Sequence, residues 1–249
     1  MLTILILGGT AEARHLAAEL NTLPDVTVIS SLAGRTSTPL LPHGRVRIGG
    51  FGGPSGLAAF LRAEHIGAII DATHPFAAVI SANAVDAAGR SGVPLLVLRR
   101  PGWISREGDD WRRVPTVADA AAALPRIGRR ALLTTGRQTL AAFAALDDVW
   151  FLVRTVEPPA PPVPAQMTVI LDRGPFTRAS ERALIETHAV DVVVTKDSGS
   201  PSTAAKLDAA RDLSIPVLIV DRPPMPTDAE SVPTVPDAVA WVVRHSARR

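Results

Sequence analysis

Residues 4–17, ILILGGTAEARHLA, place two glycines between an apolar run and a stretch of helical pattern. Glycines let the backbone come close to a phosphate, and the N–H groups that begin a helix bind anions. Against the dinucleotide fingerprint Gly-x-Gly-x-x-Gly, the turn keeps Gly8, has Thr10 at the third position and ends in Ala13. Thr10 is able to donate its hydroxyl to a phosphate. A structural glycine turn into a helix explains the same residues, so the motif alone leaves both interpretations open.

The end of the second apolar run bears on the choice of cofactor. NAD-dependent enzymes usually carry Asp or Glu at this point, where the carboxylate binds the ribose hydroxyls. The run at 26–30 has no acid there and offers two hydroxyls and a guanidinium instead, on Ser30, Ser31 and Arg35. Such groups suit the 2′-phosphate of NADP. The pattern favours NADP(H) over NAD(H), with a surface arginine as the alternative for Arg35.

Residues 71–77, DATHPFA, follow another apolar run and precede a second helical stretch. Thr73 suits the N-cap of that helix and Pro75 suits its first turn. These roles do not explain His74 and Phe76, which we expect to flank the nicotinamide or its ribose. The alternative for His74 is an ordinary solvated or hydrogen-bonded loop histidine.

Residues 134–140, TTGRQTL, are the counterpart of the first glycine turn in the second half of the chain. A helix that starts behind a glycine again offers N–H groups to an anion. We therefore expect Thr135, Gly136 and Arg137 to bind a carboxylate or a phosphate.

Residues 194–199, VTKDSG, occupy the turn that corresponds to DATHPFA. Lys196 is one of only two lysines among 26 Lys and Arg residues, and its place in this loop favours a function. The candidate general acids are Lys196 and His74, with solvent as the alternative proton donor. Further substrate contacts are expected from Asp197, Ser198, Gly199 and Arg222. A helix N-cap beside a surface lysine explains the same loop without a ligand.

Short apolar runs alternate with alanine-rich stretches along the whole chain. The runs predict buried parallel strands at 3–7, 26–30, 67–71, 94–98, 130–135, 149–156, 167–173, 191–197 and 216–223. The stretches between the first of them predict helices at 11–20, 52–65 and 77–92. The proline-rich segment 157–166 predicts a stiff loop. This alternation is typical of an α/β protein with doubly wound parallel sheets.

The sequence also repeats itself. Residues 71–101 align without a gap with 193–223, so that GVPLLVLRRP lies over SIPVLIVDRP. Farther along, VPTVADA at 114–120 matches VPTVPDA at 232–238. Two specific matches in the same order indicate an internal duplication.

The duplication predicts two Rossmann-like domains, at 1–125 and 126–249. Ligands of open α/β sheets bind beyond the carboxyl ends of the strands. We expect the first domain to bind NADP and the second mainly the substrate, with the active site in the cleft between them.

Composition excludes several classes of protein. The chain has no cysteine, which removes disulfides and cysteine-ligated metals, and no metal-binding motif is evident. No apolar stretch reaches the roughly 18 residues of a membrane span. The first residues lack a basic start and a small-residue cleavage site, so no signal peptide is expected. No basic tract with interleaved aromatics supports nucleic-acid binding. A cytoplasmic protein without membrane or nucleic-acid partners is expected.

Five motifs in order over the full length resemble the precorrin-6A reductase family of cobalamin biosynthesis: ILGGTAEARHLA, SLAGRT, DATHPFA, TTGRQTL and VTKDSG. The resemblance implies NADPH-dependent reduction of one double bond in the corrin precursor macrocycle, which gives precorrin-6B. It also implies two Rossmann-like domains, with the second half's loops facing the tetrapyrrole. The cofactor-binding residues that it implies are Gly8, Gly9, Thr10, Glu12, Ala13, Ser31, Arg35, Thr73, His74, Pro75 and Phe76.

The chemistry of this substrate fits the residues present. Its acetate and propionate groups require arginines and helix N-termini, and its imine-containing system accepts hydride without a covalent nucleophile. The sequence leaves open whether the substrate carries cobalt. Neighbouring enzymes of the pathway are conceivable partners. Two other functions stay open: an NADP-dependent oxidoreductase with a smaller substrate, and a non-catalytic two-lobed protein that binds nucleotides or anions.

Overall fold

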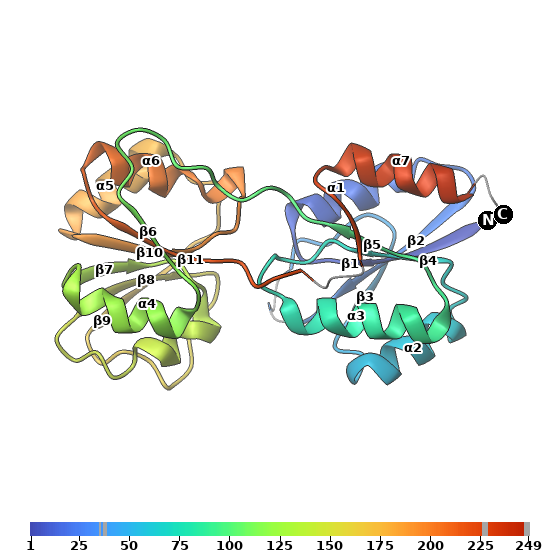
Figure 1. Ribbon diagram of the computed structural model, residues 1–249, viewed down its shortest axis with the longest axis horizontal. Coiled ribbons are helices and arrows are strands. Elements are labelled where there is room, and N and C mark those ends of the chain that lie inside the picture. The colour runs from blue at the N-terminus through green and yellow to red at the C-terminus, as the bar shows by residue number, and fades with distance from the viewer. Residues whose placement is uncertain (35, 37–38, 226–228, 247–249) are drawn as a thin grey trace. The chain divides into compact units, whose positions relative to one another are not determined.

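The computed structural model spans residues 1–249 and describes all of them except 35, 37–38, 226–228 and 247–249. The chain forms two compact units (Figure 1), one of Met1–Pro101 with Pro223–Arg249 and one of Gly102–Arg222. Each unit is built on a six-stranded parallel sheet with helices on both faces. The expected α/β class with two parallel sheets is therefore confirmed.

The sheet of the first unit has the strand order β12-β5-β4-β1-β2-β3, and its neighbouring strands run parallel. Its strands are β1 (Leu2–Leu7), β2 (Val26–Leu32), β3 (Arg45–Ile48), β4 (Ala68–Asp71), β5 (Leu95–Leu98) and β12 (Glu230–Val232). Its helices are α1 (Ala11–Leu20), α2 (Gly53–Ala63), α3 (Ala78–Ser91) and α7 (Val235–Ser246).

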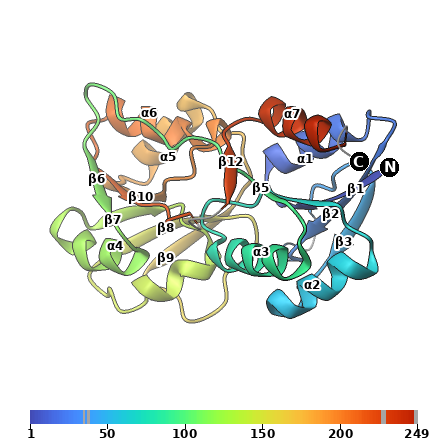
Figure 2. The ribbon, with the colours of Figure 1, turned by 45° about the vertical axis from the view of Figure 1, so that its right-hand side comes forward.

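Strand β1 is covered on both faces. Successive side chains of a strand point to opposite faces, and Ile4, Leu5, Ile6 and Leu7 are all buried. Ile4 and Ile6 pack with residues of α1 and α7, whereas Leu5 and Leu7 pack with α2 and α3. Helices α1 and α7 lie side by side on their face of the sheet (Figure 2). A continuous apolar run predicts this two-sided burial.

The sheet of the second unit has the order β6-β11-β10-β7-β8-β9, again with parallel neighbours. Its strands are β6 (Trp111–Val114), β7 (Arg130–Leu133), β8 (Trp150–Thr155), β9 (Met167–Leu171), β10 (Val192–Lys196) and β11 (Val217–Val220). Its α-helices are α4 (Val117–Ala123), α5 (Arg178–Thr187) and α6 (Ala205–Asp212). Three short 3-10 helices complete it: η1 (Leu124–Arg126), η2 (Arg137–Phe143) and η3 (Pro201–Thr203).

The two sheets have the same topology, with β7, β8, β9, β10 and β11 in the places of β1, β2, β3, β4 and β5. The last strand of each repeat is exchanged between them. Strand β6 follows β5 in the chain but pairs with β11, and β12 follows β11 but pairs with β5. The compact units therefore divide at 101/102 and 222/223, and not at 125/126 as the sequence repeat alone predicts. The physical reason is that each exchanged strand completes the open edge of the other repeat's sheet.

The nine strands expected from the apolar runs are all present, within a few residues of their predicted ends. Three strands were not predicted, namely β3 (RVRI), β6 (WRRV) and β12 (ESV). Each of them lies at an edge of its sheet, where one side meets solvent and charged side chains are tolerated. Because these three strands carry charged side chains, they do not form the apolar runs from which the other strands were predicted.

The helices are short compared with the bilayer. A transmembrane helix needs about 20 apolar residues, whereas α3 has 14 residues. Among the described residues, no helix combines the length and the apolar character that crossing a membrane requires.

Candidate active site

The glycine turn after β1 is built to admit an anion. Gly9 has a φ of +110°, and apart from its chain neighbours no described residue has an atom within 4 Å of where its Cβ would be. Only glycine adopts this conformation without strain, and the missing side chain leaves the space beside the turn open. Helix α1 begins at Ala11, so the N–H groups of its first turn have no intrahelical acceptor. These N–H groups and Gly9 form a backbone site of the kind that binds phosphate.

Thr10 is the N-cap of α1, but its hydroxyl already donates a hydrogen bond within the protein. Its Oγ1 accepts the N–H of Ala13 at 3.1 Å and donates to the carbonyl oxygen of Ala72 at 2.7 Å. The expectation that Thr10 donates its hydroxyl to a phosphate is therefore not supported. Thr10 instead joins the glycine turn after β1 to the loop after β4.

Glu12 also has a partner within the protein. Its carboxylate accepts a hydrogen bond of 2.7 Å from the guanidinium of Arg100, and both side chains are mostly buried. Desolvation is the largest effect on Arg100 and lowers its pKa. Glu12 thus anchors the segment after β5 beside the start of α1.

The end of β2 carries the hydroxyls that the sequence singled out. Ser30 is 2% exposed, and its Oγ has no hydrogen-bond partner among the described residues. The carbonyl of Ser31 accepts the N–H of Gly8 at 2.9 Å, and its hydroxyl lies 3.3 Å from Nη1 of Arg47. Arg35 lies outside the described residues. An unsatisfied buried hydroxyl is uncommon, and here it lies in a strand whose carboxyl end adjoins the glycine turn.

Arg47, which no sequence motif singles out, faces Ser31 across the β2–β3 pair. Its guanidinium lies 3.8 Å from the centre of the Phe51 ring and donates to the carbonyls of Gly49 and Gly50. Arg47 therefore orders the turn after β3, at the same carboxyl end of the strands as Ser31.

Asp71 organises the DATHPFA loop. It is 2% exposed, and its Oδ1 accepts both the N–H of Thr73 at 3.0 Å and the hydroxyl of Thr73 at 2.6 Å. Its Oδ2 accepts the hydroxyl of Ser81. Helix α3 begins only at Ala78, without a side-chain N-cap. Thr73 as N-cap and Pro75 in the first helical turn were therefore wrong predictions, because Asp71 takes the threonine hydroxyl.

His74 and Phe76 lie in the turn that Asp71 supports. The N–H of Phe76 faces Nδ1 of His74 at 3.3 Å, and the two ring centres are 5.7 Å apart. His74 is exposed, so its ring is accessible from solvent.

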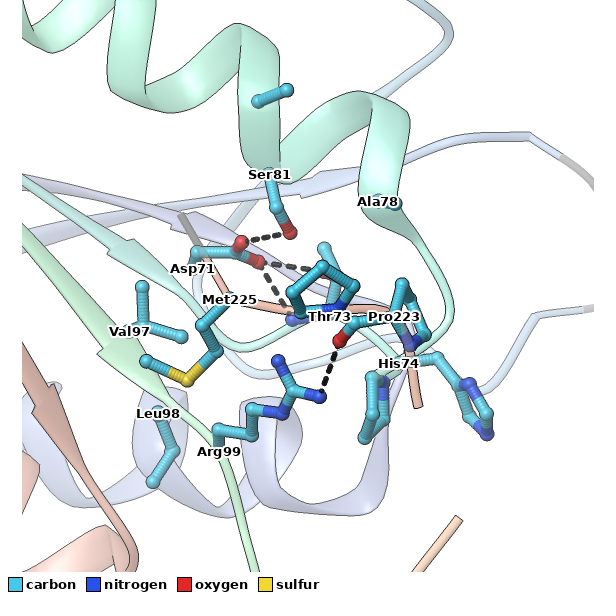
Figure 3. A pocket seen from close by; sticks show the side chains of 13 residues that line it. Asp71, Thr73, His74, Ala78, Ser81, Val97, Leu98, Arg99, Pro223 and Met225 are labelled. Atoms are coloured by element: carbon cyan, nitrogen blue, oxygen red, sulfur yellow. Dashed lines mark hydrogen bonds between the residues drawn. The ribbon is translucent and has the colours of Figure 1, made fainter. Parts of the chain in front are cut away.

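A cavity of about 420 Å³ lies at the carboxyl ends of β4 and β5. Figure 3 shows Asp71, Ser81 and Thr73 on one wall, with Arg99 and Pro223 on another. Nη2 of Arg99 donates to the carbonyl of Pro223 at 2.9 Å. The expected site residues Thr73, His74 and Pro75 all line this cavity. The volume suits a ring-sized group, and the position is where α/β sheets bind ligands.

The loop after β7 contains the predicted substrate residues of the second glycine turn. Gly136 has a φ of +86°, and no atom lies within 4 Å of where its Cβ would be. Thr135 is buried, and its Oγ1 accepts the hydroxyl of Thr139 at 2.9 Å. Arg137 forms an ion pair of 3.0 Å with Glu157. Like Gly9, Gly136 has a positive φ, but a 3-10 helix and not an α-helix follows it, and its arginine already pairs with one carboxylate.

Lys196 is the last residue of β10 and is partly buried. Its surroundings lower the pKa of the ammonium group through desolvation. Ser198 and Gly199 follow in the loop, with Gly199 at a φ of +67°. A lysine with a lowered pKa at the carboxyl end of a strand is a chemically suitable proton donor.

Asp197 and Arg222 bind each other. Nε of Arg222 donates to the carbonyl of Asp197 at 2.8 Å, and its Nη2 lies 3.8 Å from Oδ1. Asp197 is 4% exposed, and its carboxylate also accepts the N–H of Trp103 and Nη2 of Arg113. The structure thus brings these two predicted substrate residues together. It also shows that their polar groups already secure the first and last segments of the unit.

The fold and the glycine turn place the chain in the class of Rossmann-like α/β proteins, whose sheet order around β1 matches the dinucleotide-binding arrangement. Within that class, residues 3–243 match the family model "Precorrin-6x reductase CbiJ/CobK", and the chain belongs to this family.

Individual relatives agree. The chain is 56% identical over 242 residues to a precorrin-6A reductase of Rhodococcus erythropolis, which covers 97% of this chain and 98% of that one. A cobalt-precorrin-6A reductase of Priestia megaterium is 31% identical over 232 residues, with 88% and 90% covered. The solved structure of a CobK precorrin-6A reductase superposes with a TM-score of 0.92 at 40% identity and covers 98% of this chain and 97% of that one. The family expected from the motifs is confirmed.

Proposed function

We propose that this protein is a precorrin-6A reductase of cobalamin biosynthesis that uses NADPH to reduce one double bond of the macrocycle and so forms precorrin-6B. The observation that carries the proposal is the family match, which spans residues 3–243. The full-length similarity to the precorrin-6A reductase of Rhodococcus erythropolis supports the same activity.

NADPH fits the residues of the first unit. The open turn at Gly9 and the first-turn N–H groups of α1 would receive the pyrophosphate. Ser30, at the carboxyl end of β2, has a buried Oγ without a partner among the described residues, and a contact between it and the cofactor requires the covering atoms to move. The sequence assigns Ser31 and Arg35 to the 2′-phosphate, and the cavity at Thr73 and His74 would take the nicotinamide end. When bound, the cofactor supplies the hydride.

The loops of the second unit are proposed to bind the macrocycle. Precorrins carry many carboxylates, and the backbone turns at Gly136 and at Gly199, both with a positive φ, are proposed to offer N–H groups to them. Arg137 adds a positive charge that Glu157 orients. Lys196 and His74 are proposed as the general acid for the ring nitrogen or carbon that gains a proton. A single active site formed by both units stays a prediction.

We further propose that the substrate lacks cobalt. The Rhodococcus relative named for precorrin-6A is 56% identical, whereas the Priestia relative named for cobalt-precorrin-6A is 31% identical. Similarity to the first is therefore far greater. A side-by-side assay with both substrates tests this choice.

The decisive experiment is anaerobic incubation of the protein with precorrin-6A and NADPH, followed by the absorption spectrum of the macrocycle. We expect NADPH consumption to match the spectral change mole for mole. Parallel reactions with NADH, with cobalt-precorrin-6A and with no protein serve as controls. A folded protein that binds NADPH and leaves the spectrum unchanged would defeat the assignment.

A further inference from the structure

Donors outside the loop 197–203 of the second unit bind several of its carbonyl groups, and one of these donors, Lys206, lies just beyond the end of the loop. Nε of Arg222 binds the carbonyl of Asp197. Nε1 of Trp103 donates to the carbonyl of Ser200 at 3.3 Å, and the N–H of Phe176 donates to that of Ser202 at 3.1 Å. Nζ of Lys206 donates to the carbonyl of Thr203. Carbonyl oxygens are the negative ends of peptide dipoles and repel carboxylates. Their engagement with protein donors therefore prepares the loop for an anionic ligand.

Lys206, which lies in the first turn of α6, is the most unusual of these donors. It is 2% exposed, and its ammonium nitrogen lies 4.8 Å from the centre of the Trp103 ring. Close to it is a buried ion pair between Arg154 of β8 and Glu181 of α5. The guanidinium of Arg154 in turn lies 3.7 Å from the centre of the Phe176 ring. The lysine and the ion pair thus adjoin both aromatic residues that bind the loop.

A lysine is not required at this place by the fold. The internal repeat aligns Lys206 with Ala84 of α3, and Ala84 is fully buried in the first unit. The aligned position of the first unit, in the middle of α3, is therefore filled by a small apolar residue, whereas Lys206 lies in the first turn of α6. Burial of an ammonium group is unfavourable, and with Arg154 and Glu181 it leaves two cationic side chains beside one anionic one. The presence of Lys206 calls for a reason other than packing.

We propose that Lys206 is a positioning residue for the substrate. By binding the carbonyl of Thr203 and the face of Trp103, it fixes loop 197–203 in the conformation that receives carboxylates of the macrocycle. This inference rests on the proposed function, because it assumes that the loop carrying Ser198 and Gly199 contacts precorrin-6A. The inference adds Lys206 to the residues of the proposed site, although Lys206 itself contacts neither substrate nor cofactor.

The test compares three substitutions with the wild type. Lys206→Met removes the donor, Lys206→Gln keeps a neutral donor, and Arg182→Met changes an exposed charge on α5 as the control. We expect Lys206→Met to raise KM for precorrin-6A about tenfold, the order expected for loss of a buried hydrogen bond. The dissociation constant for NADPH should change by less than about twofold, because cofactor binding is assigned to the other unit. Lys206→Gln should recover most of the loss, and the control should match the wild type.

Hydrogen exchange gives a second readout that does not depend on turnover. Lys206→Met should raise amide exchange in 197–204 while the strands of both sheets keep their protection. If methionine is not accommodated, Lys206→Ala, which copies Ala84, takes its place. An unchanged KM, or a loss of NADPH binding in step with KM, would overturn the inference. A wild type that fails to reduce precorrin-6A would instead refute the proposed function, which separates the two failures.

Discussion

The hydroxyl of Thr10 donates a hydrogen bond of 2.7 Å to the carbonyl of Ala72, across 62 residues of sequence. It thereby joins the glycine turn that follows β1 to the loop that follows β4. The same oxygen accepts the N–H of Ala13 as the N-cap of α1. One side chain thus couples the proposed phosphate site to the cavity proposed for the nicotinamide.

Thr10→Val is expected to remove both bonds while it keeps the shape of the side chain. Loss of an N-cap and of a buried hydrogen bond should lower the free energy of unfolding by about 2 kcal/mol. The affinity for NADPH should fall as well, because the turn and the loop lose their connection. Urea unfolding and fluorescence titration with NADPH measure the two effects. Thr10→Ser retains both bonds and should behave nearly as the wild type does.

Substitution of the buried Asp71 should lower the free energy of unfolding more than substitution of an exposed aspartate does. Asp71→Ala leaves the hydroxyls of Thr73 and Ser81 and the N–H of Thr73 without their acceptor. We expect a loss of about 2–3 kcal/mol in the free energy of unfolding and weaker NADPH binding. Asp86→Ala, which removes an exposed i,i+4 pair with Arg90, should change stability by less than about 0.5 kcal/mol. Equal effects of the two substitutions would argue against an organising role for Asp71.

The sequence predicted the buried strands well because two-sided burial demands continuous apolar runs. It did not predict β3, β6 and β12, since edge strands accept arginines and glutamates. The exchange of β6 and β12 between the two sheets could not be predicted either. The repeat shows which segments are related, but not which sheet each segment joins.

The residues of the candidate site likewise fall into two groups, those that the sequence predicts and those that it does not. The glycine turn, Thr73, His74 and Lys196 could be found from local motifs at strand ends. Asp71 could not, because its role depends on Ser81, ten residues further on. Lys206, the second of the two lysines, could not be predicted as a site residue, since a lysine normally lies at the surface. Partners that come together only through tertiary folding are not visible in a local pattern.

Cofactor preference tests the assignment of the second strand end. Arg35→Ala should reduce the ratio of NADPH to NADH affinity by about tenfold or more, because a guanidinium bound to the 2′-phosphate is a charge-assisted contact. NADH affinity itself should stay nearly constant. Arg62→Ala, on the exposed side of α2, is the matched control. A wild-type protein that binds both cofactors equally would refute the strand-end argument.

Lys196→Ala is expected to slow turnover without weakening cofactor binding. A general acid contributes about 100-fold or more to the rate, so kcat should fall by roughly that factor while the dissociation constant for NADPH is unchanged. Desolvation lowers the pKa of Lys196, so the wild-type rate should decline with rising pH at values below the usual lysine range. Single-turnover rates across pH measure this limb. An unchanged rate in the variant would return Lys196 to the role of a partly buried strand-end charge.

Lys206 should also leave a signature in the pH dependence of stability. Burial, followed by the positive charge of Arg154, lowers its pKa to about 7, while Glu181 acts in the opposite direction. Between that pH and the usual lysine pKa, the unfolded chain binds a proton that the folded chain does not. The contribution of this site to the free energy of unfolding therefore rises with pH, by up to about 1.4 kcal/mol per unit.

Lys206→Met removes this titration and leaves the other groups in place. Urea unfolding of both proteins at pH 7 and pH 8.5 should show the wild type gaining about 1–2 kcal/mol more than the variant as the pH rises. The difference between the two proteins isolates the site, because Arg154 and Glu181 are present in both. Stability curves that stay parallel over this interval would mean that Lys206 keeps an ordinary pKa despite its burial. Its ammonium would then have to be stabilised by the carbonyl of Thr203, the Trp103 ring and Glu181.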